Sequence, residues 1–144
     1  MQNIDSLVKQ LVATHGEDGV CPTAESWREI FRLGGNSPIH IINLLKFKHR
    51  VESADGPIAG AVAYAKYSAD VGGAFSRVGG KRLHFGRVGH IFGLGPVNDW
   101  DAAIVTRYPS AEALAEMWLS REFIAAHKNR ADGVEQSQVL VFGE

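Results

Sequence analysis

One segment of ten residues constrains the fold of this chain more than any other. Residues 38–47 read Pro-Ile-His-Ile-Ile-Asn-Leu-Leu-Lys-Phe, a run of β-branched and apolar side chains. The run lacks the polar alternation of a strand that has one face in water, so it predicts a strand covered on both faces. At 144 residues the chain has the size of one domain, and this strand is expected in the middle of its sheet.

Other segments predict the elements around this strand. Apolar residues recur three and four positions apart in residues 3–15 and 24–33, which predicts an N-terminal helical extension over residues 1–36. A helix is expected over 58–78, weakened by Gly72 and Gly73 near its end. Strands are expected over 81–92, 100–108 and 136–142, with helical turns between 110 and 131.

The order of these elements from residue 37 to residue 144 is strand, helix, strand, strand, helix, strand. This order is typical of the α+β, ferredoxin-like βαββαβ arrangement, a four-stranded antiparallel sheet with its first and third strands in the middle. Helices would cover one face, and the central strands would leave apolar side chains on the other. We therefore expect a homodimer, a dimeric α/β barrel in which two sheets meet.

Charge and cysteine content exclude several classes of protein. Fifteen basic and sixteen acidic side chains give a net charge of -1, which argues against nucleic acid or an anionic membrane as partner. The single cysteine, Cys21, allows no internal disulfide and no paired-cysteine zinc or redox motif. Because no signal peptide and no apolar run of about 20 residues is visible, a cytoplasmic protein is expected.

Glycine is unusually frequent in one region, with eight of the sixteen glycines between residues 72 and 95. A phosphate-binding loop is not expected there, because the region lacks both GxGxxG between a strand and a helix and GxxxxGK[ST]. The glycines instead predict an outer strand that bends around a cavity. Bulges or positive φ angles are expected at Gly86, Gly89 or Gly93.

Polar side chains among apolar ones indicate a candidate small-molecule site, because a buried polar group needs a partner. Asn43 in the central strand either forms a hydrogen bond within the cavity or to neighbouring backbone, or contacts a ligand. Arg107 in the other central strand either forms a buried salt bridge or binds a substrate carboxylate. Tyr64 and Tyr67, three positions apart on the predicted helix, either pack in the core or offer a proton or hydrogen bond to a bound oxyanion.

Two histidines complete the candidate site. His84 and His90 lie six residues apart on the predicted outer strand, roughly 20 Å from each other, so they are not expected to share a metal ion. One of them would serve as a general base near neutral pH. We expect His84 and Tyr67 to be catalytic, no metal and no cofactor to be required, and the ligand to contact Asn43, Arg107, Tyr64, His90 and Trp100.

Several short segments resemble the domain-of-unknown-function family DUF1330. The resemblance covers residues 38–143 and is most specific from Asp99 to Ser110. It implies the ferredoxin-like fold of the dimeric α/β-barrel superfamily, whose members include cofactor-free monooxygenases, haem-degrading enzymes, muconolactone isomerases and chlorite dismutase-like proteins. The matching segments are Ile42–Phe47, Tyr64–Tyr67, Gly79–Arg82, Trp100–Asp101, Tyr108–Ala111 and Arg121–Phe123, together with the single residues Gly86, Met117 and Arg130.

The expected function is the binding of a small molecule in the barrel cavity. If the protein is an enzyme, we expect a cofactor-free oxygenase or isomerase that acts in this cavity. The alternative is a non-catalytic ligand-binding or assembly module whose polar groups satisfy one another. A cavity too small for a ligand, with Arg107 already paired to an internal carboxylate, would indicate that alternative. Haem chemistry is a third, weaker option that an absorption scan after haem addition would test.

Overall fold

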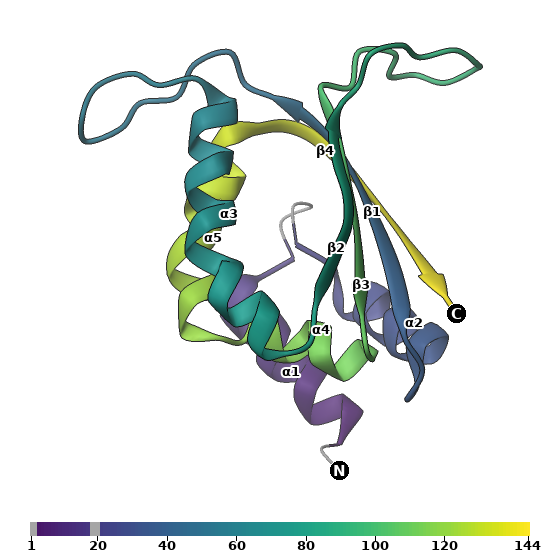
Figure 1. Ribbon diagram of the computed structural model, residues 1–144. Helices are drawn as coiled ribbons and strands as arrows, with labels where there is room; N and C mark the ends of the chain where they lie inside the picture. Colours follow the sequence, from purple (N-terminus) through teal and green to yellow (C-terminus); the bar gives the residue numbers. More distant parts are fainter. Residues whose placement is uncertain (1–2, 18–20) are drawn as a thin grey trace.

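A computed structural model describes residues 3–17 and 21–144, and its centre is one antiparallel sheet. The sheet has the strand order β2-β3-β1-β4, which places the first and third strands in the middle, as the sequence predicts. Helices α3 (Gly60–Arg77) and α5 (Arg121–Gly133) lie side by side on one face of the sheet (Figure 1). This is the α+β, ferredoxin-like arrangement. The strands are β1 (Ile39–Phe47), β2 (Lys81–Arg87), β3 (Ala102–Tyr108) and β4 (Val134–Gly143).

Three further helices gather at one end of the molecule: α1 (Ile4–His15), α2 (Ala24–Gly34) and α4 (Ala111–Trp118). The Thr23 side chain accepts a hydrogen bond from the backbone of Ser26 and caps α2. Apolar side chains of α1 and α2 join the same core as those of the sheet and the other helices. The division into residues 1–36 and 37–144 as separate units stays a prediction. No described helix is both long and apolar enough to cross a bilayer.

The two faces of the sheet differ in what covers them. Ile41 and Asn43 of β1 pair with Thr106 and Ile104 of β3, and these side chains lie on the inner face, beneath the helices. The alternate residues form the outer face, where Leu140 and Phe142 of β4 are exposed. Apolar side chains also lie on the outer face at the middle of the sheet: Ile42, Leu44, Ala103 and Val105.

A bulge changes which face the β2 side chains occupy. Arg82 pairs with Thr106 and His84 pairs with Val105, so Leu83 is an extra residue in this strand. Arg82 and His84 would share a face in a regular strand, but one inserted residue moves the following side chains to the opposite face. Arg82 lies on the inner face and His84 on the outer face.

The strands next to the glycine-rich segment are shorter than predicted. β2 ends at Arg87 rather than at residue 92, and β3 begins at Ala102 rather than at residue 100. Gly93 has the expected positive φ, at 120°, whereas Gly86 and Gly89 do not. The bulge lies at Leu83, not at a glycine. The turn between the strands is thus longer than the alternation of side chains suggested.

Helix α3 runs without interruption through Gly72 and Gly73, so the expected weakening does not end it. Its start is fixed by a close approach to the end of α5. A Cβ built on Gly60 would lie 2.5 Å from the carbonyl oxygen of Gly133 and still closer to that of Lys48, well inside van der Waals contact. The two glycines allow the helices to meet above the sheet.

Candidate functional site

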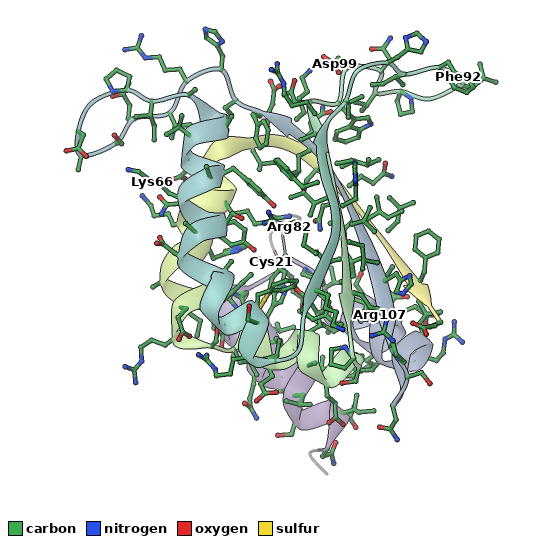
Figure 2. The ribbon with its side chains drawn as sticks, viewed as in Figure 1. Cys21, Lys66, Arg82, Phe92, Asp99 and Arg107 are labelled. Carbon is green, nitrogen blue, oxygen red and sulfur yellow. The ribbon has the colours of Figure 1, made fainter. Side chains whose placement is uncertain are left out.

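A cavity of about 540 Å³ lies between the inner face of the sheet and the helices. This volume is within the range of roughly 300–1,000 Å³ that is usual for small-molecule sites. Side chains of β1, β3, β4, α3, α4 and α5 line it, together with residues of the segment 21–33. The N-terminal extension therefore forms part of the cavity wall. Figure 2 shows Cys21 and Arg82 in the space between the helices and the sheet.

The cavity contains a buried cation, Arg130 of α5. Only 5% of the residue is exposed, and its Nη1 atom has no hydrogen-bond partner. It forms no ion pair with any carboxylate of residues 3–17 or 21–144. A buried charge without a counter-charge is costly to the fold, so Arg130 is where an anion would be stabilised most.

The sequence places Arg130 on the buried face of its helix. Phe123, Ala126, Arg130 and Gly133 are the buried residues of α5, at spacings of three and four. Arg130 thus occupies a position in the helical repeat where an apolar side chain is usual. The family resemblance includes Arg130, but sequence reasoning gives it no role in the site, although its place in the helical repeat was an available signal.

Two tyrosines of α3 lie beside this cation. Tyr64 and Tyr67 are buried, line the cavity, and have ring centroids 5.3 Å apart. Burial raises the pKa of both phenols, and the positive charge of Arg130 opposes that rise in each case. Both phenols therefore stay protonated at neutral pH and act as hydrogen-bond donors rather than as bases.

A second arginine reaches the cavity from the edge of the sheet. Arg82 of β2 lines it, and its Nη2 atom donates a hydrogen bond to Ser68 Oγ at 3.0 Å. The charged residues that line the described part of the cavity are Arg82, Arg130 and the acidic Glu29. The Glu29 carboxylate already forms an ion pair with Arg32. The cavity accordingly carries an excess of positive charge.

Asn43 lies on the inner face of the central strand, opposite Ile104 of β3 and Val139 of β4. It lines the cavity, and its amide forms no hydrogen bond with a described residue. The structure thus brings Asn43, Tyr64 and Tyr67 together around one space. That they bind a ligand stays a prediction.

Arg107 lies outside this group. Neighbouring Thr106 and Tyr108 line the cavity, so Arg107 points to the outer face of β3. Its Nε atom donates a hydrogen bond to Glu144 Oε2 at 3.1 Å, and His40 Nε2 lies 3.2 Å from the same oxygen. Arg107 therefore forms a salt bridge, but a partly exposed one rather than the buried one expected, and it does not line the cavity.

The other predicted residues are also apart from the cavity. His84 lies on the outer face, and His90 stacks on exposed Phe92 in the turn after β2, with ring centroids 6.3 Å apart. Trp100 lines a separate hollow of about 450 Å³ beside β4. None of the described histidines lines the main cavity, so an imidazole base is not positioned there.

Residues 57–144 match the family model described as Domain of unknown function (DUF1330). The chain belongs to this family. The DUF1330 match runs from before α3 to the end of β4 and leaves Ile42–Phe47 outside it. A solved structure of a protein of unknown function from Rhodopseudomonas palustris is similar, with 31% identity and a TM-score of 0.76. The alignment covers 85% of this DUF1330 chain and 94% of the Rhodopseudomonas palustris chain.

More distant structures share the fold. A protein from Caulobacter crescentus, described as a candidate antibiotic biosynthesis monooxygenase, is 14% identical over 79% of this chain and 95% of its own, with a TM-score of 0.53. A dimeric ferredoxin-like protein of unknown function from Thermobifida fusca is 18% identical, with a TM-score of 0.50. The alignment covers 74% of this chain and 91% of the Thermobifida fusca chain. These likenesses show the ferredoxin-like fold. No curated protein matches the chain.

Proposed function

We propose that this chain binds a small organic anion with an apolar body in the cavity between α3, α5 and the sheet. The observation that carries the proposal is Arg130, a buried guanidinium with an unpartnered Nη1 atom in a cavity of ligand size. A carboxylate or enolate would supply the missing counter-charge and accept hydrogen bonds from a planar donor. Arg82 adds a second positive charge at the cavity edge.

The rest of the cavity supports a specific orientation for such an anion. Tyr64 and Tyr67 donate hydrogen bonds to its oxygens, and the amide of Asn43 contacts a carbonyl or hydroxyl further along the sheet. The remaining wall suits an aromatic or alkyl group, since it is mostly apolar. Its apolar lining includes Ile41, Val71, Ile104, Leu114, Met117 and Trp118.

A second candidate is a cofactor-free enzyme of the oxygenase or isomerase type. It is favoured by the same Arg130, Tyr64 and Tyr67, because donors fixed around a developing oxyanion stabilise enolate or phenolate intermediates. The fold likeness to the candidate monooxygenase from Caulobacter crescentus agrees with this possibility. The absence of an imidazole among the described lining residues favours binding without proton abstraction.

Calorimetric titration of the full chain tests the binding proposal. Benzoate, naphthoate and decanoate are compared with their neutral methyl esters, which keep the apolar body and remove the charge. We expect saturable binding of one anion per chain and at least about tenfold weaker binding of the matching ester, from the loss of charge-assisted hydrogen bonds. Equal binding of acid and ester, or no binding of any anion, would contradict it.

The enzymatic candidate has its own test. An aryl β-keto ester is incubated with the protein in deuterated buffer, and proton NMR follows exchange at the carbon between its two carbonyl groups. Exchange faster than in buffer, and slowed by Tyr67→Phe, would support stabilisation of the enolate. Exchange at the buffer rate in a protein that binds the ester would favour the non-catalytic binding module.

We also infer that the chain forms a homodimer through the outer face of its sheet. Ile42, Leu44 and Val105 lie at the middle of that face, and Leu140 and Phe142 are exposed at its edge. An exposed apolar surface on a sheet favours association with a like surface, and a two-fold axis would place each sheet against its partner.

A further inference from the structure

Three side chains from separate segments converge beside the cavity. His15 ends α1, Cys21 precedes α2, and His127 lies on α5. One donor atom from each, a ring nitrogen or the thiol sulfur, lies within 4.8 Å of the other two. Cys21 Sγ and His127 Nε2 are 3.2 Å apart, and the two imidazole rings have centroids 5.4 Å apart. Residues that are distant in the sequence thus form a compact group of nitrogen and sulfur donors.

One of the distances within this group is close to that of a tetrahedral zinc site. With zinc–sulfur bonds of about 2.3 Å and zinc–nitrogen bonds of about 2.0–2.1 Å, neighbouring donors lie about 3.3–3.6 Å apart. The separation of Cys21 Sγ and His127 Nε2 approaches this value. The widest separation in the group would have to close by about 1 Å, a change of the size that side-chain rotation gives.

The surroundings of His15 also suit metal ligation. Its Nε2–H donates a hydrogen bond to the backbone carbonyl of Trp118 at 2.7 Å. That bond fixes the tautomer, so Nδ1 keeps its lone pair. Histidines that bind metals usually donate their other ring N–H to a carbonyl or carboxylate, which orients the ring and increases its basicity.

An aromatic shell surrounds the three donors. Trp118 and Phe123 pack against His15 with centroid distances of 5.2 and 5.4 Å, and against His127 at 5.6 and 5.3 Å. Cys21 is 4% exposed. This shell limits access of water, and two imidazoles with one thiolate are ligands that suit zinc rather than magnesium or calcium.

We propose that His15, Cys21 and His127 bind one Zn²⁺ ion, with water or another oxygen at the fourth position. On binding, the Cys21 thiol releases its proton to solvent, zinc–sulfur and zinc–nitrogen bonds form, and water ligands of the ion leave, with no change of oxidation state. The ion ties the segment before α2, which forms part of the cavity wall, to α5, which carries Arg130. Zinc thereby holds the wall of the cavity closed.

The test uses the full chain after treatment with a chelator. Zn²⁺ is titrated against a competing indicator, and Co²⁺ is added separately as a spectroscopic substitute. We expect one ion per chain, tetrahedral cobalt bands in the visible, and a thiolate-to-cobalt charge-transfer band in the near ultraviolet. Cys21→Ser should abolish that band, and His127→Gln should weaken zinc binding at least about tenfold. His49→Gln, in an exposed loop, should change neither.

Thermal unfolding distinguishes loss of the site from loss of the fold. Zn²⁺ at a hundredfold excess over its Kd should raise the Tm of the unaltered chain by about 5–10 °C. It should not raise the Tm of Cys21→Ser, whose metal-free Tm should stay close to that of the metal-free parent. Failure to bind zinc, or zinc binding by Cys21→Ser equal to that of the parent, would overturn the proposal. Either result leaves the anion titration of the cavity unaffected.

Discussion

Burial of the Tyr64 phenol on α3 raises its pKa, and the nearby guanidinium of Arg130 on α5 opposes that rise. The same guanidinium opposes the rise at Tyr67. The two packed helices therefore present one cation flanked by two protonated phenols to the cavity. Such a group stabilises a bound anion by charge and by hydrogen bonds together.

The tyrosines give a prediction at alkaline pH. All three, Tyr64, Tyr67 and Tyr108, are buried, and burial raises each pKa above 10.0. Because the unfolded chain ionises first, their contribution to stability is full below pH 10 and is lost as pH rises toward the folded values. Phenolate absorbance should stay low at pH 10 and rise only with unfolding seen by circular dichroism. Ionisation near pH 10 in a native spectrum would contradict this burial.

The contact between α3 and α5 predicts opposite effects for two glycines of one helix. Gly60→Ala places a methyl group against the backbone of Lys48 and the carbonyl of Gly133 and should lower the free energy of unfolding by about 1–3 kcal/mol. Gly72→Ala meets no atom within 4 Å and should raise it by up to about 1 kcal/mol through helix propensity. Urea denaturation measures both. Equal effects would mean that the backbone of Lys48 and Gly133 does not approach Gly60 closely.

Arg82, at the edge of the cavity, should contribute less to anion binding than Arg130, and its contribution should depend on salt. Arg82→Gln should weaken naphthoate binding about three- to tenfold at low ionic strength and less at high salt, because its charge is partly in water. Arg87→Gln, at the end of the same strand and outside the cavity lining, is the matched control. Calorimetry at two salt concentrations separates them. An equal loss in both variants would indicate general electrostatic attraction instead.

The outer face of the sheet predicts the oligomeric state. Val105→Glu puts a charge at the middle of the apolar face and should convert a dimer to a folded monomer in sedimentation velocity. Phe92→Glu changes an apolar side chain that is already 90% exposed in the turn after β2, so the dimer should persist. A monomeric parent, or a dimeric Val105→Glu variant, would be inconsistent with pairing through this face.

The order of the elements follows from local patterns, which is why it is predictable from the sequence. The β-branched run before Phe47 marks a central strand, and the spacing of Tyr64 and Tyr67 places both on the inner face of α3. Side-chain direction at Arg107 and His84 is less predictable, because alternation changes with a single residue. The inserted Leu83 has no marked sequence signature, yet it moves His84 to the outer face.

The groups that depend on tertiary contacts could be predicted only in part, since the helical repeat marks Arg130 as buried but does not show what surrounds it. Arg130 belongs to the cavity because α5 packs on α3, and no local pattern shows that its neighbours lack a carboxylate. His15, Cys21 and His127 are brought together by the packing of the N-terminal segment against α5. Cys21 lies 6 residues after His15 and 106 residues before His127, and no sequence motif at these separations predicts that the three side chains are close.

The most direct measurement of the central claim is naphthoate binding by Arg130→Met, with Arg121→Met on the exposed part of α5 as the control. Removing an unpaired buried charge should leave the Tm unchanged or raise it, while binding weakens about tenfold to a hundredfold. Arg121→Met should bind as the parent does. Naphthoate binding by Arg130→Met within twofold of the parent would contradict the claim that this guanidinium holds the anion.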